Sequence, residues 1–383
     1  ANLSVSASNT QNGNGPATNS LAVDTTAPIV KISRSGTHVV TKDHATTTNN
    51  SETLTFTFSE DPSGFTLDDV SVSNATAGTD FTWGTLSSKL GTGTANDPYR
   101  YTATFTPKST WTYAGDVGFS VTSAKFTDGA SNPNASSESF ALPVDTSKPM
   151  ATASNPVVSA LDSANNAISA AATYTSSTQR PLVAGDRVVF SIGFNEDVYI
   201  SGASPQIPFT ANATAGPSLQ RTAIYDANLS TTKLLKFVYT VASGDFDNVG
   251  GISFSANALT LPNGTAIRDI NGNQANIQHL ASASNSYTID AVASAATLSF
   301  VTSGGTDNTY ILGDEVKVKA TFSQGSYSVE NILVSGTGTN VPYVNLNIGG
   351  VNRKAYYSSG GNSNNEVVFA YTIDTGDNTA QGI

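Results

Sequence analysis

The sequence has no cysteine among its 383 residues, which excludes disulfide bonds and thiolate metal ligands. A large protein without disulfides needs another means of stabilisation, and bound calcium is a common one. Histidine is also rare: His38, His44 and His279 lack zinc-type spacing, and we interpret them as loop residues. No run approaches the roughly 18 apolar residues of a membrane-spanning helix. No signal peptide is present, and because the first residue is Ala1, we expect targeting information to lie outside this sequence.

Charge is scarce and mostly negative. Charged residues make up 12% of the chain, against about 25% in typical proteins. The formal net charge is -11 and the pI is near 4.6. An acidic surface argues against nucleic acid and against insertion into or binding to anionic membranes, and it favours cation binding. A hydrophobic share of 38% still allows packed cores, which excludes global disorder.

Apolar and polar residues alternate along most of the chain, which indicates β-strands, and no segment keeps a helical period over three turns. Two strand patterns each occur three times. The first covers residues 54–58, 188–194 and 316–322, and the second covers residues 99–105, 235–241 and 367–373. A Gly-Asp pair that reads as a turn follows the second pattern each time, at Gly115, Gly244 and Gly376.

A short repeated motif separates these patterns. Residues 144–149 read Val-Asp-Thr-Ser-Lys-Pro, residues 23–28 read Val-Asp-Thr-Thr-Ala-Pro, and Ile289-Asp290-Ala291 is a reduced form. Proline restricts its own φ and that of the residue before it, so the motif predicts a stiff, non-helical joint. The joint aspartates lie 121 (145 − 24) and 145 (290 − 145) residues apart, which predicts tandem modules.

A seven-stranded sandwich of the immunoglobulin type needs about 100 residues, so one such sandwich fits each repeat. We therefore predict an all-β fold of tandem immunoglobulin-like β-sandwich modules in an extended array. The predicted modules are 24–144, 145–289 and an incomplete 290–383, with residues 1–23 forming the last two strands of a module in a neighbouring copy. A lone hairpin is marginal in water, so we do not expect 1–23 to fold alone.

Two arrangements would join the copies. The chain is one period of a longer polypeptide of three-module repeats, or separate subunits pass residues 1–23 into the open module of a neighbour by strand addition. Such a head-to-tail contact builds a filament when it does not close into a ring. An arbitrary boundary of the sequence is the remaining explanation.

At these residues the sequence resembles the bacterial immunoglobulin-like repeats of giant surface adhesins, of the RTX and biofilm-associated type. The resemblance rests on the joint, on Phe58-Ser59-Glu60 and Phe194-Asn195-Glu196, on residues 237–245, and on residues 267–273. It implies a bacterial cell-surface or matrix location, calcium-stiffened extension and a role in adhesion or spacing. The third module departs from the pattern, since Gln324 stands where the others have glutamate and its joint lacks proline.

Strand order alone places acids together. In a seven-stranded sandwich, the start of the first strand, the loop after the second and the loop before the last share one end. Calcium accepts six to eight oxygen ligands in irregular geometry, and unpaired carboxylates that lie close together repel one another without a cation. The calcium ligands predicted in this way are Asp24, Glu60, Asp61 and Asp128 in the first module, and Asp145, Glu196, Asp197, Asp269 and Asn271 in the second, with Asp245 and Asp290 at the opposite end. The competing interpretation is that such residues only cap turns.

The sequence contains no motif that indicates an active site. It has no nucleophile turn and no glycine-rich phosphate loop followed by a helix. We therefore predict a non-enzymatic structural segment of an extracellular filament or adhesin whose partners are copies of itself. The alternatives are an adhesin region that binds a carbohydrate or surface ligand, for which Trp83, Trp111 and the tyrosines are candidates, and a noncatalytic repeat region of a secreted hydrolase.

Overall fold

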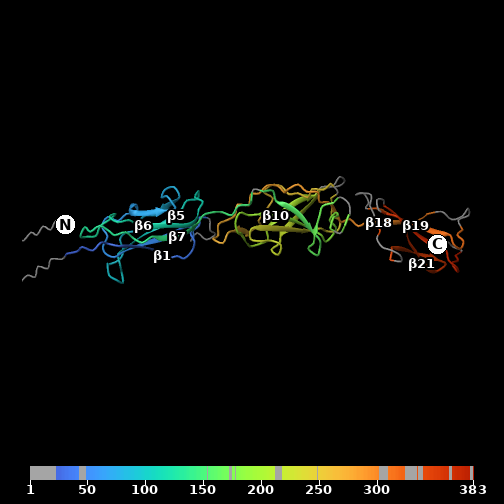
Figure 1. Ribbon diagram of the computed structural model, residues 1–383, viewed down its shortest axis with the longest axis horizontal. Helices are drawn as coiled ribbons and strands as arrows, with labels where there is room; N and C mark the ends of the chain where they lie inside the picture. The colour runs from blue at the N-terminus through green and yellow to red at the C-terminus, as the bar shows by residue number, and fades with distance from the viewer. Residues whose placement is uncertain are drawn as a thin grey trace, which may run out of the picture. The chain divides into compact units, whose positions relative to one another are not determined.

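The computed structural model describes residues 23–42, 49–152, 154–171, 175–176, 178–211, 218–247, 249–301, 309–323, 334, 340–361, 365–379 and 383. Within these ranges the fold is all-β, as the alternation predicted, and helical structure is limited to short 3-10 turns such as η2 at Leu67–Asp69 (Figure 1). No helix in this part of the chain has the length and hydropathy that crossing a bilayer requires. The predicted hairpin before residue 23, His44 and Gln324 lie outside the described residues.

The first module is a sandwich of two antiparallel sheets around one core. One sheet has the order β1-β2-β5-β4 and the other the order β3-β6-β7. Alternate residues of β2 point inward, so Leu54, Phe56 and Phe58 are buried among aromatic rings. The strands are β1 (Val30–Arg34), β2 (Glu52–Phe58), β3 (Val70–Ser73), β4 (Phe81–Trp83), β5 (Arg100–Pro107), β6 (Ala114–Val121) and β7 (Phe140–Asp145).

The turn expected at Gly115-Asp116 is not present. Both residues lie within β6, where Gly115 pairs with Val144 and Asp116 pairs with Pro143. The expectation was wrong because the pair follows β5 only after a separate segment. The Gly-Asp pair forms a turn only where it directly follows the strand, as it does after β14 and β22.

The second module is built on a six-stranded sheet with the order β12-β13-β14-β10-β8-β9, and the short pairs β11-β16 and β15-β17 lie outside this sheet. Its core combines the inner face of the sheet with Ile252, Phe254 and Leu259 from the segment between β15 and β16. The strands are β8 (Val157–Leu161), β9 (Ala167–Ile168), β10 (Arg187–Gly193), β11 (Tyr199–Ser201), β12 (Gln206–Ala211), β13 (Leu219–Tyr225), β14 (Leu234–Thr240), β15 (Phe246–Asp247), β16 (Ala266–Arg268) and β17 (Ile289–Asp290).

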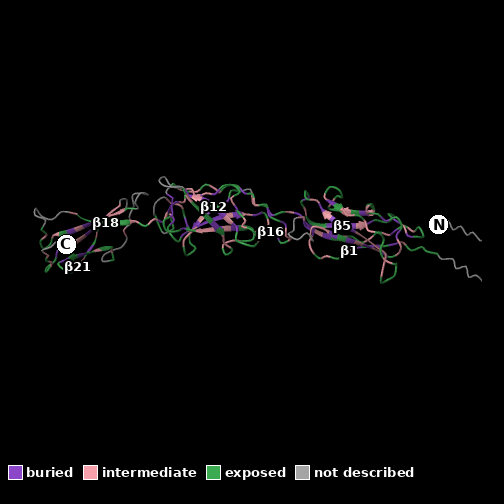
Figure 2. Ribbon diagram, turned by 180° about the vertical axis from the view of Figure 1, so that it is seen from behind, coloured by how far each residue is buried: buried purple, intermediate pink, exposed green. Residues whose placement is uncertain are grey.

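The third module consists, in its described residues, of one five-stranded antiparallel sheet with the order β18-β19-β22-β21-β20. Its core is small and lies along β19, β20 and β22. Every residue of β18 except the last is exposed (Figure 2). The strands are β18 (Ala295–Val301), β19 (Glu315–Ser323), β20 (Tyr343–Ile348), β21 (Val351–Gly360) and β22 (Glu366–Thr372).

Packing divides the chain into two compact units. One extends up to Lys148 and includes Ile270–Gln274, and the other comprises Pro149–Asp269 and the chain from Ala275 onward.

Val40 pairs in parallel with Val144, which leads into the second joint. The N–H of Val40 donates to the carbonyl of Pro143 at 3.0 Å, and the N–H of Asp145 donates to the carbonyl of Val40 at 2.8 Å. The two hydrogen bonds of Val40 thus reach the residues on either side of Val144, and the side chains of Val40 and Val144 are both buried. We call Val40 the clamp residue of the first module.

The second module repeats this arrangement with Leu182 as its clamp residue. The N–H of Leu182 donates to the carbonyl of Thr288 at 2.9 Å, and the N–H of Asp290 donates to the carbonyl of Leu182 at 2.8 Å. Ile289 lies between them and is fully buried. The joint aspartate therefore has the same backbone partner in both modules.

Candidate metal centre

Two backbone pairings bring three distant segments of the first module together. Ile29, just after the first joint, accepts a hydrogen bond from the N–H of Ser59 at 3.0 Å. Ser63, in the loop after β2, exchanges two hydrogen bonds with Thr127, at 2.7 and 3.2 Å. The start of the module, the loop after β2 and the loop before β7 therefore share one end, as the strand order predicted.

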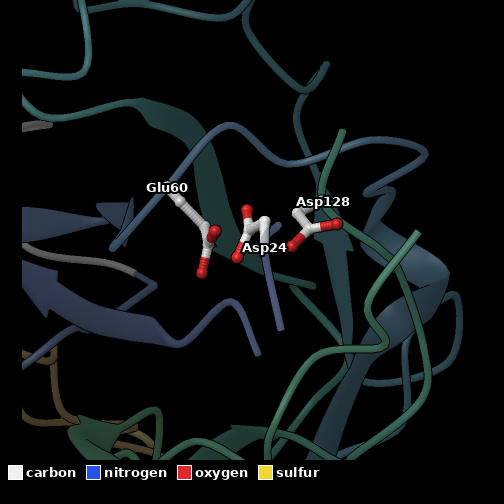
Figure 3. A group of neighbouring side chains, drawn as sticks. All are labelled: Asp24, Glu60 and Asp128. Atoms are coloured by element: carbon white, nitrogen blue, oxygen red, sulfur yellow. The ribbon is translucent and has the colours of Figure 1, made fainter. Parts of the chain in front are cut away.

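Three carboxylates converge where these segments meet. One ligand oxygen from each of Asp24, Glu60 and Asp128 lies within 4.8 Å of the others. Figure 3 shows the three side chains directed toward one another. Asp24 is exposed, Glu60 is half-buried and Asp128 is buried, so one side of the cluster faces solvent.

Burial, mutual repulsion and hydrogen bonds set the electrostatics of the cluster. Burial raises the pKa of Glu60, and the negative charges of Asp24 and Asp128 raise it further. Burial acts in the same direction on Asp128, but hydrogen bonds from Asn132 and from the backbone N–H groups of the turn outweigh it, so the pKa of Asp128 is lowered. Asp128 is thus held as a carboxylate beside an acid that resists ionisation.

The loop before β7 preorganises Asp128. Its Oδ1 accepts the N–H groups of Ala130 and Asn132, each at 2.8 Å, and its Oδ2 accepts the side-chain amide of Asn132 at 2.8 Å. The same amide donates to the backbone carbonyl of Asp24 at 3.2 Å. The oxygens are therefore fixed before any ion arrives, and an all-oxygen donor set with an open side fits calcium, with further carbonyls or waters completing its shell.

Asp61, predicted as a ligand with Glu60, lies outside this cluster. Its Oδ1 accepts a hydrogen bond from the ammonium of Lys89, and this bond raises the pKa of Lys89. The sequence could not have shown this pairing, because the two residues come from separate loops. Asp61 therefore serves as a matched control for Glu60.

The second joint repeats part of the arrangement. Asn273 donates its side-chain amide to the backbone carbonyl of Asp145 at 3.0 Å, as Asn132 does to that of Asp24. Asn271 donates to Oδ2 of Asp145 at 2.6 Å, and the N–H of Ser147 donates to its Oδ1 at 3.0 Å. The structure thus brings Asp145 and Asn271 together, but the carboxylate is engaged by amides.

The remaining predicted ligands of the second module lie in the other compact unit. Glu196 is half-buried and Asp269 is buried. Asp197 is exposed, and its Oδ1 accepts the hydroxyl of Thr232 at 2.6 Å. Within the described residues, Asp24, Glu60 and Asp128 form the only group of three acids close enough to share an ion. Calcium at these positions stays a prediction.

Asp245, predicted at the opposite end of the second module, is occupied by partners of its own. Its carboxylate, only 1% exposed, accepts Nη2 of Arg221 at 2.6 Å, Oη of Tyr239 at 2.5 Å and the N–H of Ala242 at 2.9 Å. Asp290 pairs with Phe246 through the backbone, and its side chain as a ligand stays a prediction. These contacts give Asp245 a structural role, and calcium binding by Asp245 stays a prediction.

The third module contains the same Arg-Tyr-Asp triad, which the sequence analysis missed. Arg353 donates to Oδ1 of Asp377 at 2.8 Å through Nε, and Tyr371 donates to Oδ2 at 2.7 Å. A repeated spacing could have revealed it. The arginine precedes the tyrosine by 18 residues (239 − 221 and 371 − 353), and the aspartate follows the tyrosine by 6 (245 − 239 and 377 − 371).

Asp247 is a buried acid that forms no ion pair with the residues the structure describes. Its side chain has 0% exposure, and burial raises its pKa although the N–H groups of Val249 and Gly250 donate to Oδ1. Its Oδ2 has no hydrogen-bond partner among the residues that the structure describes.

Because the folded state resists ionising Asp247, the charged form at neutral pH destabilises the second module. We expect Asp247→Asn to raise the melting temperature at pH 7, with the difference vanishing as the pH falls below the ordinary value of 3.8. Thermal unfolding across that pH range measures this. A lower melting temperature for the variant in calcium-free buffer would contradict it.

Comparison with known proteins supports the fold of the first module. Residues 24–144 match the family model of a bacterial immunoglobulin-like domain. The match covers less than half of the chain. A search of curated proteins found no match.

Proposed function

We propose that this protein is a noncatalytic structural repeat of a bacterial cell-surface or matrix protein, in which immunoglobulin-like modules set spacing and calcium stiffens the joints. Copies continue head to tail through the third module. The observation that carries the proposal is the convergence of Asp24, Glu60 and Asp128 at a joint. A bacterial immunoglobulin-like domain also fits a surface repeat or adhesin-like role.

The position of the cluster explains how calcium would stiffen the chain. Asp24 belongs to the joint, whereas Glu60 and Asp128 belong to the body of the module. An ion bound by all three would tie the joint to the sandwich. It would also cancel the repulsion that, in addition to burial, raises the pKa of Glu60. The joint would then lose conformational freedom, which is the physical meaning of stiffening here.

The tryptophans do not favour the carbohydrate-binding alternative. Trp111 is 9% exposed, and Trp83 packs against Phe81 and Phe105 in the core of the first module. The feature that favours that alternative is a pair of tyrosines on the third sheet, Tyr343 and Tyr356, whose rings lie 6.0 Å apart and are partly exposed. Titration with mixed glycans, using a Tyr343→Ser variant as control, tests it.

Calcium is expected to raise the melting temperature of the first module by several degrees, because a ligand at 100 times its Kd adds about 2.7 kcal/mol. Glu60→Gln should abolish most of this increase and should stabilise the calcium-free module by removing one repelling charge. Differential scanning calorimetry with calcium or chelator measures both effects.

Asp61→Asn is the matched control, since Asp61 pairs with Lys89 and lies outside the cluster. It should keep the full calcium response. The raised pKa of Glu60 also predicts how stability depends on pH. The calcium-free module gains stability as the pH falls through that pKa. Below the ordinary pKa value of 4.5, Glu60 adds no further stability. An equal calcium response in wild type and Glu60→Gln would exclude this site.

A further inference from the structure

The inner face of the third sheet is open at β18. Leu298 and Phe300 are 54% and 50% exposed. Phe300 has the register position that Val158 holds in the second module, where exposure is 7%. Pro156, which corresponds to Leu298, is also buried. The second module thus shows how this face looks when it is covered.

In the second module, residues 283–290 provide part of that cover, together with Ile252 and Phe254. The N–H of Ala283 donates to the carbonyl of Pro156 at 2.8 Å, and the side-chain amide of Asn285 donates to the carbonyl of Ile252 at 2.7 Å. Ile289, at 0% exposure, fills the core, and β17 pairs with β15. This segment closes the module with both backbone and apolar contacts.

At the corresponding place the third module has a groove of about 420 Å³, lined by Phe300, Tyr310, Ile348 and residues 377–379 among others. A second hollow of about 220 Å³ adjoins it and shares Phe300 with it. Residues 378–379 follow Asp377 just as β15 follows Asp245, so they are the counterpart of β15. In the second module β15 pairs with β17, and in the third module its counterpart lines the groove.

Tyr310 has the place of the clamp residue. The N–H of Val183, just after the clamp Leu182, donates to Oδ2 of Asp186 at 2.8 Å. The N–H of Ile311, just after Tyr310, donates to Oδ2 of Asp314 at 2.9 Å. The two turns are therefore equivalent, and the third module carries a clamp position at the edge of its groove.

The chain also carries a second copy of the covering sequence. Residues 17–24 read Ala-Thr-Asn-Ser-Leu-Ala-Val-Asp and residues 283–290 read Ala-Ser-Asn-Ser-Tyr-Thr-Ile-Asp, so the alanine, asparagine, serine and aspartate recur in register. Val23 is 73% exposed, whereas its counterparts Val144 and Ile289 are 1% and 0% exposed. The first joint thus begins with an exposed apolar residue, whereas the other two copies bury theirs.

We propose that residues 17–24 of a second copy of this chain bind in the groove of the third module, as residues 283–290 cover the second. The inference rests on the proposed tandem array and specifies its partner and register. Val23 pairs with Thr379 as Ile289 pairs with Asp247, and Asp24 pairs with Asn378 as Asp290 pairs with Phe246. Tyr310 donates its N–H to the carbonyl of Ala22 and accepts the N–H of Asp24.

Sedimentation velocity of the full chain over a concentration series tests this. Wild type should associate into chains of increasing length. Val23→Ser and Phe300→Ser should each weaken association by at least about tenfold, because each removes an apolar side chain from the contact. Val23→Ile and Leu312→Ser should not, since the first keeps the apolar side chain and the second changes an exposed turn residue outside the groove.

Mixing the two weakened variants separates a lost contact from a lost fold. Val23→Ser keeps an intact groove, and Phe300→Ser keeps an intact donor segment. An equimolar mixture should form 1:1 dimers with no longer species. A monomeric wild type at all concentrations, or association that neither substitution weakens, would overturn the proposal.

Paired cysteines test the register, since the natural chain has no cysteine of its own. Val23→Cys combined with Thr379→Cys should form intermolecular disulfides under a mild oxidant, giving a ladder on a non-reducing gel. Val23→Cys combined with Asn378→Cys should cross-link far less, because adjacent strand residues point to opposite faces. Equal cross-linking of the two pairs would refute the stated register.

The proposed function and this inference fail separately. A calcium response at Glu60 without association would leave the spacer role and remove the strand-addition partner. Association that persists in chelator, together with no calcium response at Glu60, would keep this inference and remove calcium from the proposed function.

Discussion

Asp245→Ala is expected to lower the free energy of unfolding of the second module by about 3 kcal/mol, because it removes two hydrogen bonds to a buried carboxylate from polar side chains and one from the backbone. Arg221 is 40% exposed and can regain hydration, which limits the loss. Tyr239 is less exposed than Arg221. Its pKa is raised, mainly by burial and secondly by the hydrogen bond to Asp245. Urea unfolding followed by circular dichroism measures the change.

The structural role of Asp245 predicts the same loss with calcium and with chelator. A loss seen only in calcium would instead make Asp245 a ligand. Asp377→Ala is the matched variant, since it removes the same triad from the third module. It should leave the second module unchanged.

Asn134→Ala is expected to lower the free energy of unfolding of the first module by about 3–4 kcal/mol, because a buried amide that makes four hydrogen bonds is lost. Its Oδ1 accepts the N–H groups of Lys125 at 2.7 Å and Phe126 at 3.0 Å. Its Nδ2 donates to the carbonyls of Thr122 and Ala135, each at 2.8 Å. The side chain is 2% exposed, so water cannot replace these partners.

Thermal and urea unfolding of the full chain would show the loss as an unfolding transition of the first module at lower temperature and at lower urea concentration. Asn132→Ala is the matched control, since Asn132 lies two residues away at the carboxylate cluster. It should cost less stability but weaken the calcium response. A loss below about 1 kcal/mol for Asn134→Ala would mean that the loop rearranges to satisfy its own backbone.

Much of the fold could be predicted because strands leave a short-range pattern. The alternation at residues 54–58 and 188–194 predicted β2 and β10. The joint motif predicted where similar segments recur. The pairing of six strands into one sheet in the second module could not be predicted, since it depends on contacts between residues far apart in the sequence.

The candidate site shows the same division. Strand order predicted that Asp24, Glu60 and Asp128 share one end, and the structure places them together. The strand order could not distinguish these acids from Asp61 and Asp245, which the structure pairs with Lys89 and Arg221. The sequence positions of the acids contain no information about which basic side chains lie beside them. The binding of calcium itself stays a prediction.

The clamp residues have a mechanical consequence. Val40 and Leu182 hold the exit of their modules through parallel pairing, with one hydrogen bond on each side of a buried residue. Tension that pulls the start and the end of such a module apart loads these two bonds in shear, so both must break at once. A hairpin that peels open breaks its bonds one after another, at lower force. The first and second modules are therefore built to resist traction at the points where their chains leave them.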